Sequence, residues 1–350
     1  RGIRPAGERR GTLEEHIHVF GGEERFWLGP EGGQFSVYFA PGAPFEFEHW
    51  RVPAPLDTEP FRVESRARDA VRLSHRFVLT NWSGHVRACR VERSIHLIDT
   101  RAALAVWTPS VPLGIEGVAY ESDNRLTNTG DSPWTPDTGL LSIWILGMFR
   151  PSPRTTVVIP VRAGPESELG PVVNDAYFGR IPSNHLVVTT HHVFFRADGT
   201  RRGKIGVSPR RSRGVAGSWA ADHGVLTLVS YVPPEGSVRY VNSAWELQTD
   251  PYNGDVINAY NDGPPAPNLP PLGPFYELET SSPGGELAPG ETLRHVSRTC
   301  HVRGPRAALD AIARAALGIP PAYSLHRAGC SAHRRGRRSG KRPGPPCSFH

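Results

Sequence analysis

The sequence has few cysteines and lacks the short motifs that most often reveal an enzyme's chemistry. It holds four cysteines in 350 residues and no Cys-x-x-Cys pair, which argues against a disulfide framework or a zinc knuckle. The Gly-x-Ser-x-Gly, His-Glu-x-x-His, Gly-x-x-x-x-Gly-Lys and Gly-x-Gly-x-x-Gly patterns are all missing. The serine hydrolase, zincin, P-loop and dinucleotide-binding classes therefore have no local support, and we expect no cofactor.

Long apolar runs and lysines are also scarce. The longest strongly apolar segment is GLLSIWILGMF at 139–149, far shorter than the roughly 20 residues that a membrane-spanning helix needs. We therefore expect no membrane insertion. Lysine occurs only at Lys204 and Lys341, so nearly all of the 40 basic residues are arginines.

The positive charge of the chain belongs to its C-terminal end. The formal net charge is +6, but residues 326–350 carry seven arginines and lysines and no acid, which leaves residues 1–325 at −1. A tail rich in Gly, Pro, Arg and Ser buries too little apolar surface to fold. We expect a disordered basic tail at 326–350, a single near-neutral domain at 1–325, and no nucleic-acid partner.

Deletion of residues 326–350 is expected to leave folding and activity unchanged, because such a tail adds nothing to a packed core. The melting temperature and the activity of the truncated chain test this expectation. A large fall in either would contradict it.

The rest of the chain has the pattern of an all-β protein. Short alternating or β-branched runs are separated by turn signals such as NTGD, ADGT and PPEG, which is typical of a sandwich or barrel. Proline accounts for 35 of the 350 residues, and it suits loops and sheet edges better than helices. The strongest strand candidates are GQFSVYFA, RLSHRFVLT, CRVERSIHLI, LSIWILGMF, TTVVIPV, LVVTTHHVFF, GVLTLVSYV, FYELET and TLRHVSRTCHV.

One helix is predicted near the end of the domain, at 304–319. Leu309, Ile312 and Ala316 repeat at helical spacing, and Gly318 fits the C-terminal stop. This stripe predicts a helix that covers the end or edge of a sheet.

Three segments, 23–53, 174–192 and 239–264, mix aromatic residues with acids, amides and histidine. Sugars bind such surfaces, because aromatic faces take the C–H face of the ring while polar side chains bond the hydroxyls. The alternative for each residue is a place in the core or in a turn. The candidates for sugar binding are Arg25, Trp27, Glu48, Trp50, Trp245, Tyr252, Asn258, Tyr260, Asn261 and Asp262.

The predicted strand at 273–283, GPFYELETSSP, carries two carboxylates two residues apart, Glu277 and Glu279. Side chains at this spacing share one face of a strand. A glycosidase uses two carboxyl groups that flank the scissile bond, and these two would lie on one side of it. We therefore expect one of them to act with a partner from another strand.

A second pair with this spacing is Glu46 and Glu48, next to His49. His49 and His185 are candidate acid/base imidazoles, although an isolated histidine is more often structural or solvated than catalytic. A calcium ion is an alternative to the expected absence of a metal, because hard oxygen ligands are dense at Asp250, Asp255 and Asp262.

Four long strings, which lie at 21–39, 45–61, 240–264 and 275–299, together resemble an uncharacterised bacterial family of domains of unknown function. That family is similar to the galactose-mutarotase-like β-supersandwich, and the resemblance covers about residues 18–320. It implies a supersandwich with one C-terminal helix, and N-terminal strands that this chain would lack.

The resemblance also implies roles for particular residues. LETSSPGGELAPGETL is similar to the late strand that bears the essential glutamate, which gives the general-base role to Glu279 or, failing that, to Glu277. Aldose epimerases carry a histidine after the NTGD-like turn, where this chain has Ser142 and Trp144. The second epimerase histidine has a counterpart only in the chain position of His185.

The sequence leaves three interpretations open. In the first, Glu279 is the acid/base of an epimerase-like enzyme, a glycoside hydrolase or a polysaccharide lyase, assisted by Glu277, His185 or His49, and acts on a mono-, oligo- or polysaccharide. In the second, the acids only accept hydroxyl hydrogen bonds in a carbohydrate-binding module. In the third, the chain is a structural domain of a larger secreted or periplasmic protein.

Overall fold

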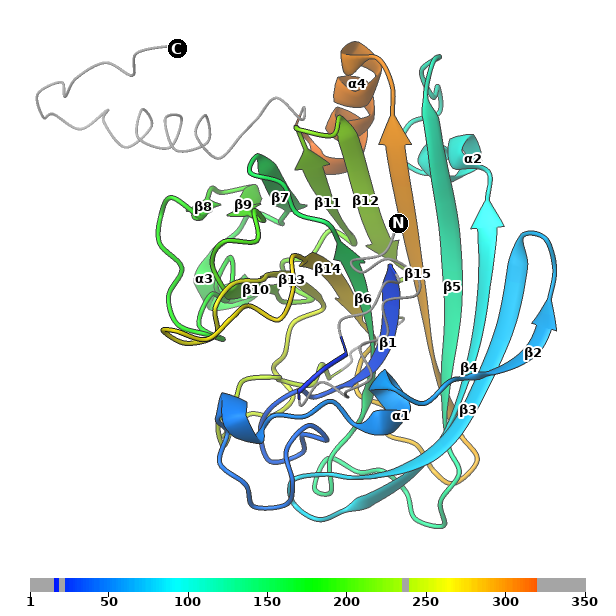
Figure 1. Cartoon of the computed structure of the whole chain (residues 1–350), viewed down its shortest axis with the longest axis vertical. Coiled ribbons are helices and arrows are strands. Elements are labelled where there is room, and N and C mark those ends of the chain that lie inside the picture. Colours follow the sequence, from blue (N-terminus) through cyan, green and yellow to red (C-terminus); the bar gives the residue numbers. More distant parts are fainter. Residues whose placement is uncertain (1–15, 19–22, 235–238, 320–350) are drawn as a thin grey trace, which may run out of the picture.

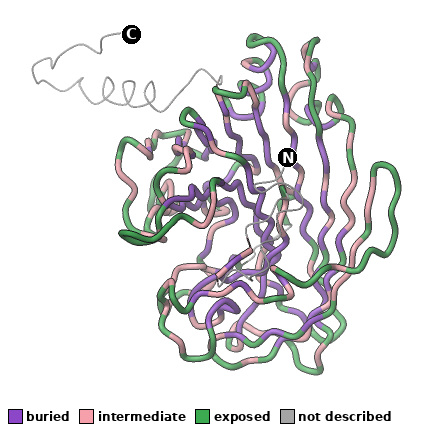
Figure 2. The backbone as a smooth tube through the Cα atoms, in the orientation of Figure 1, coloured by how far each residue is buried: buried purple, intermediate pink, exposed green. Residues whose placement is uncertain are grey.

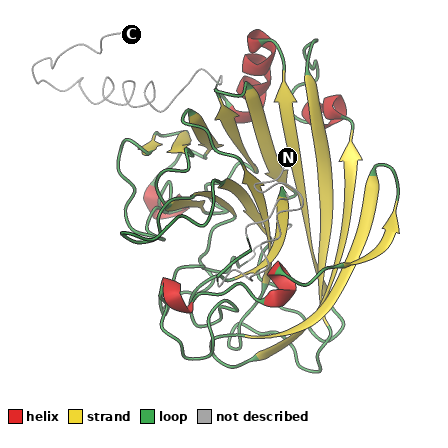
Figure 3. Cartoon of the chain, viewed as in Figure 1, coloured by secondary structure: helices red, strands yellow, loops and turns green. Residues whose placement is uncertain are grey.

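The computed structural model describes residues 16–18, 23–234 and 239–319, and these form two antiparallel β-sheets with short helices at their margins (Figures 1 and 3). The predicted all-β class is confirmed. The expected tail at 326–350 and the first 15 residues lie outside the described residues. No described helix is long and apolar enough to cross a membrane.

The smaller sheet has five strands in the order β1-β6-β14-β13-β10. Its strands come from every part of the chain, so strands that are adjacent in the sheet are rarely consecutive in sequence. The bounds are β1 Glu24–Gly29, β6 Ser142–Phe149, β14 Tyr276–Ser281, β13 Ile257–Asn261 and β10 Gly203–Val207.

The larger sheet has ten strands in the order β2-β3-β4-β5-β15-β12-β11-β7-β9-β8. Its centre is the long β4-β5-β15 ladder, which Figure 1 shows running the length of the molecule. The bounds are β2 Arg62–Arg66, β3 Ala70–Thr80, β4 Val86–Ile98, β5 Glu116–Asn128, β15 Thr292–Arg303, β12 Val225–Tyr231, β11 Val215–Ala220, β7 Thr155–Pro160, β9 His192–Arg196 and β8 Leu186–Val188.

The core between the sheets follows from the alternation of side chains along the strands. Leu278 of β14 and Ile257 of β13 pack in one buried cluster with Val157 of β7 and Val229 of β12. All residues of β6, β14, β13 and β10 are buried. Figure 2 shows these strands as buried backbone, in contrast to the exposed β2–β3 hairpin. The smaller sheet is thus covered on both faces.

The interior also contains a polar layer. His295 of β15 is buried, and its Nε2 lies 2.9 Å from Thr280 Oγ1 of β14. Burial lowers the pKa of His295 from 6.5 to about 3, because an imidazolium there would lose its hydration. The ring of Tyr231 stacks on it at 6.2 Å between centroids. His295 is therefore neutral in the folded protein.

The predicted C-terminal helix is confirmed as α4, Arg306–Leu317. Its buried face includes Leu309 and Ile312, which pack against β7, β11 and β12. The short helix α2, Thr100–Ala105, joins the same cluster and is capped by the Asp99 carboxylate, which accepts from the amide of Ala102. These helices cover one end of the larger sheet (Figure 1).

Three further one-turn helices occur in loops, where the sequence shows no periodic signal to predict them. Their bounds are α1 Ala54–Asp57, α3 Glu166–Leu169 and the 3₁₀ turn η1 Phe47–His49.

Candidate functional site

The outward face of the smaller sheet carries the two glutamates of β14. Thr280 on the opposite face of β14 bonds His295 of the larger sheet, so Glu277 and Glu279 point away from the larger sheet. In the register with β13, Glu279 pairs with Asn258 and Glu277 with Tyr260. This face thus brings together Glu277, Glu279, Asn258 and Tyr260, four of the residues singled out in the sequence.

Glu279 makes its strongest contacts with two neighbours in the sheet. Its Oε2 accepts a hydrogen bond of 2.8 Å from Trp144 Nε1 of β6 and lies 3.6 Å from Lys204 Nζ of β10. The Lys204 ammonium also donates to Glu31 Oε2 at 3.0 Å and lies 4.3 Å from the centroid of the Trp144 ring. Lys204, Glu31 and Glu279 are all at least 95% buried. We call Lys204, Glu31, Glu277 and Glu279 the buried charge cluster.

The buried charge cluster contains three carboxyl groups and a single ammonium group. Burial and the neighbouring charge of Glu279 raise the pKa of Glu277 well above its usual value. Burial also raises the pKa of Glu279, against the opposing charge of Lys204. Burial works against the Lys204 ammonium, but the charges of Glu279 and Glu31 prevail and raise its pKa. The cluster therefore favours a charged lysine and keeps protons on Glu277 and Glu279 to a higher pH than is usual for a glutamate.

One oxygen of the cluster has no partner. Glu279 Oε1 is buried and accepts no hydrogen bond from the described residues. A buried carboxylate oxygen without a donor is costly. This oxygen is consequently available to a proton or to a ligand hydroxyl.

A further carboxylate, the partly buried Asp255, lies beside the cluster. It accepts hydrogen bonds from Tyr177 Oη at 2.6 Å and Asn174 Nδ2 at 3.2 Å, and burial raises its pKa. Asp255, Tyr177 and Lys204 line a small cavity of about 10 Å³, which is room for roughly one water molecule. The site is therefore closed in this conformation.

The predicted aromatic platform lies above this face, within a packed layer. Trp27 of β1 is buried and contacts Trp50 and Trp144, with centroids 6.2 and 5.3 Å away. Trp50 stacks on the partly buried Trp245 at 6.0 Å. The rings thus cover one another and the sheet.

Other sugar-binding candidates form hydrogen bonds to neighbouring segments of the chain. Arg25 of β1 donates to Asp57 of α1 at 3.0 Å. Asn261 Nδ2 donates to the carbonyl of Arg201 at 2.9 Å. Asp262 accepts from the amide of Gly273 at 2.7 Å and from the hydroxyl of Tyr260, and burial raises its pKa to about 6.

The two candidate histidines lie apart from the charge cluster. The imidazole of His185 contacts the side chains of Asn184 and Asp198, the second at 3.9 Å. Partial burial lowers the pKa of His185. His49 lies 3.3 Å from the exposed Glu48. Tyr252, another sugar-binding candidate, donates to the carbonyl of Pro136.

The oxygen-rich segment predicted for calcium is spread over separate contacts. Asp255 bonds Tyr177 and Asn174, Asp262 bonds Gly273, and Asp250 accepts from the amide of Tyr252. Within the described ranges, the three residues that bring ligand atoms within 4.8 Å of one another are Glu46, Glu48 and His49, of which the two glutamates are exposed.

Four residues of the site were not recognised in the sequence as parts of it: Lys204, Glu31, Tyr177 and Trp144. A usable signal existed for Lys204, since it is one of only two lysines and lies in a segment that otherwise uses arginine. Glu31 and Tyr177 come from loops far away in the chain, and no local pattern connects them with β14.

The fold and the site define a two-sheet β-protein with a buried carboxylate–lysine cluster on the outward face of its smaller sheet. The chain belongs to the family described as "Family of unknown function (DUF6786)", which it matches over residues 8–322. No curated protein sequence matches it. The resemblance to a family of unknown function is thereby confirmed.

Solved structures similar to the chain include proteins of the galactose mutarotase and aldose epimerase group. A candidate aldose 1-epimerase from Escherichia coli K12 has 13% identity and a TM-score of 0.44, covering 80% of this chain and 84% of that one. The Slr1438 protein from Synechocystis sp. PCC 6803 has 13% identity and a TM-score of 0.44, with 83% and 80% covered. A galactose mutarotase-like protein from Lactobacillus casei ATCC 334 has 11% identity and a TM-score of 0.41, with 79% and 84% covered.

Proposed function

We propose that the protein is carbohydrate-active and transfers a proton to or from a sugar through Glu279. The observation that carries this proposal is the buried charge cluster, in which Glu279 has a raised pKa, a lysine neighbour and one oxygen without a partner. Titratable groups with strongly perturbed pKa values in a buried site are typical of acid/base catalysis.

The chemistry follows from the charges of the cluster. A carboxyl group whose pKa is raised above its usual value gives and takes a proton at a higher pH than an exposed carboxyl group does. Glu279 would exchange a proton with a sugar hydroxyl or ring oxygen through its unpartnered Oε1. Lys204 would stabilise the carboxylate form of Glu279 by its charge. Glu277, which shares the face, would stay protonated because burial and the charge of Glu279 raise its pKa well above the usual value.

Entry of a sugar requires movement of the loops above the sheet. The small cavity beside Lys204 is lined in part by Tyr177, Val241 and Ser243, all of which lie outside the strands. Displacement of these loop residues would widen the cavity at Lys204, whose ammonium lies 3.6 Å from Glu279. Closure over the sugar would then exclude water from the proton transfer.

Replacement of Glu279 by glutamine tests the proposal, because the amide keeps the shape and loses the titrating proton. We expect Glu279→Gln to lower turnover at least about 10²-fold, as for loss of a general acid or base, while sugar affinity falls much less. Product formation by NMR and affinity by calorimetry measure the two effects. Glu246→Gln is the matched control, since Glu246 is exposed in the segment between β12 and β13.

Two results would overturn the proposal. Unchanged turnover in Glu279→Gln would remove Glu279 from the mechanism. Saturable sugar binding by the wild-type protein without any product would show a binding module, in which the acids only accept hydrogen bonds.

A further inference from the structure

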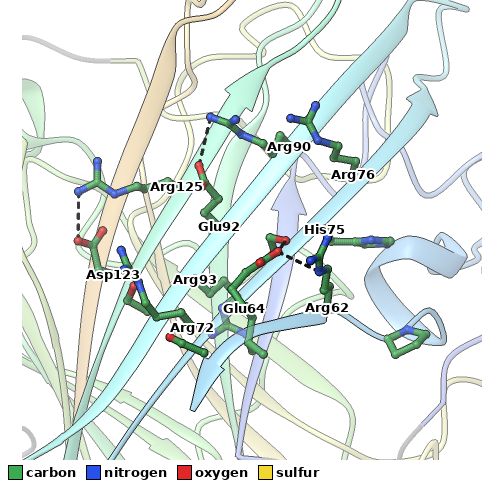
Figure 4. A pocket seen from close by; sticks show the side chains of 15 residues that line it. Arg62, Glu64, Arg72, His75, Arg76, Arg90, Glu92, Arg93, Asp123 and Arg125 are labelled. Atoms are coloured by element: carbon green, nitrogen blue, oxygen red, sulfur yellow. Dashed lines mark hydrogen bonds and ion pairs between the residues drawn. The ribbon is translucent and has the colours of Figure 1, made fainter. Parts of the chain in front are cut away.

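A second polar site lies on the larger sheet and is built by strands other than those that carry the charge cluster. It is an open cavity of about 750 Å³ over β2, β3, β4 and β5 (Figure 4). Six arginines and three carboxylates line it, which leaves an excess of positive charge. The arginines are Arg62, Arg72, Arg76, Arg90, Arg93 and Arg125.

Most of these side chains point away from the molecular core. In β3 and β4 the residues Phe77, Cys89 and Val91 are buried in the core cluster. Arg76 and Arg90 alternate with them along the strands and therefore lie on the opposite, outward face. The helices α2 and α4 cover the other end of this sheet, so the cavity lies on the uncovered end of a charged sheet face.

The arginines are arranged unfavourably for a protein without a ligand. Arg76 of β3 lies directly across from Arg90 of β4 in the register, and Arg125 of β5 lies directly across from Arg294 of β15. Like charges in directly opposite positions destabilise a sheet. Among the described residues, neither Arg72 nor Arg76 has an ion-pair partner.

The three carboxylates of the cavity are already engaged. Glu92 pairs with Arg90 at 3.2 Å and Glu64 with Arg62 at 3.5 Å. Asp123 accepts two hydrogen bonds of 3.0 Å from Arg294, which lies at the margin of the cavity. These pairs fix the positions of some arginines, and the charges of Arg72 and Arg76 remain uncompensated.

We propose that this cavity binds an acidic oligosaccharide, with its carboxylate or sulfate groups held between Arg76 and Arg90 and at Arg72. A planar guanidinium group suits these oxyanions because it offers parallel N–H donors. The ion-paired carboxylates of Glu64 and Glu92 accept hydrogen bonds from the sugar hydroxyls, and the hydroxyl of Ser94 donates to them or accepts from them.

The lining favours a saccharide over a nucleic acid. Proteins that bind single-stranded nucleic acids stack the bases on aromatic side chains. The residues that line this cavity include no Phe, Tyr or Trp, and residues 1–325 carry a net charge of −1. An acidic saccharide would bind here through its oxyanions and hydroxyl groups rather than by stacking on aromatic rings, and these groups match the Arg, Ser and Glu side chains of the lining.

Trigalacturonate is the probe, and its fully methyl-esterified form is the neutral control of the same shape. We expect the wild-type chain to bind the acid at least about tenfold more tightly than the ester at about 0.15 M salt, because this salt screens charges more than about 8 Å apart and leaves direct contacts between arginine and carboxylate. Arg76→Gln is expected to weaken binding of the acid at least about tenfold, as for loss of a charge-assisted hydrogen bond. Calorimetry measures the Kd values, and the melting temperature of Arg76→Gln should not fall.

Matched variants separate this site from general charge effects and from the charge cluster. Arg303→Gln removes an exposed arginine of β15 outside the cavity, and it should leave the Kd unchanged. Glu279→Gln should also leave it unchanged, because Glu279 lies on the other sheet, so the outcome is independent of the proposed function.

Four outcomes would overturn the inference. They are equal affinity for the acid and its ester, an equal loss of binding in Arg303→Gln, inorganic sulfate bound as tightly as trigalacturonate, and a single-stranded RNA oligonucleotide bound more tightly than trigalacturonate.

Discussion

Lys204→Met is expected to destabilise the protein by about 3–5 kcal/mol, because removal of one partner from a buried ion pair leaves the other charge uncompensated. Methionine has nearly the length of lysine and keeps the packing against Trp144. The loss would come from Glu31 and Glu279, which lie 3.0 and 3.6 Å from the ammonium and have no other cation within ion-pair distance among the described residues. Denaturant unfolding followed by circular dichroism measures the effect.

A double variant separates the charge effect from any packing effect. Glu31→Gln in the Lys204→Met background removes one of the uncompensated carboxylates, so it should restore part of the lost stability. Arg303→Met, at an exposed position of β15, should change the free energy of unfolding by no more than about 0.5 kcal/mol. A cost below about 1 kcal/mol for Lys204→Met would mean that Lys204 does not neutralise the cluster.

Acid is expected to destabilise the fold through His295, which is buried between the sheets. Its folded-state pKa of about 3 lies below the ordinary value of 6.5, so the unfolded chain binds this proton more tightly than the folded protein. The stabilisation is complete above pH 6.5 and is lost as the pH falls toward 3. One unit of pKa difference corresponds to about 1.4 kcal/mol, so the total loss is ~5 kcal/mol.

His295→Gln isolates this effect from other titrating groups. The glutamine amide can still bond Thr280 Oγ1 but takes up no proton in this range. The raised pKa values of Glu277 and Glu279 act in the opposite direction, since their contribution to stability is present at low pH and is lost as the pH rises through the folded-state values. Because only the wild type carries this histidine, its free energy of unfolding should fall relative to that of His295→Gln as the pH drops from 6.5 to 3. Parallel stability curves would contradict a neutral His295.

Much of the fold was predictable because the elements have local patterns. The apolar run at 139–149 contains β6, and the stripe of Leu309 and Ile312 marks α4. The order β1-β6-β14-β13-β10 was not predictable, since it joins strands from both ends of the chain. Such long-range pairing depends on which buried faces fit together, and no short stretch of sequence encodes that.

The site was only partly predictable for a related reason. The spacing of Glu277 and Glu279 requires them to share a face, and the structure places both on the outward face of β14. The contact of Lys204 with Glu31 joins residues 173 positions apart, so the neutralising charge could not be read from the segment around β14. The tryptophans predicted as a sugar platform lie in a packed aromatic layer, because burial depends on what folds over a residue rather than on its type.

Proton NMR of the anomeric region tests the central claim most directly. The protein without residues 326–350 is added to a panel of aldoses and plant or algal oligosaccharides, and the same panel is recorded with Glu279→Gln. We expect new anomeric or unsaturated-sugar signals, or faster exchange between anomers, with the wild-type protein and none of these with the variant. Identical spectra from the two proteins, or a panel that stays unchanged with the wild type, would contradict proton transfer to sugars by Glu279.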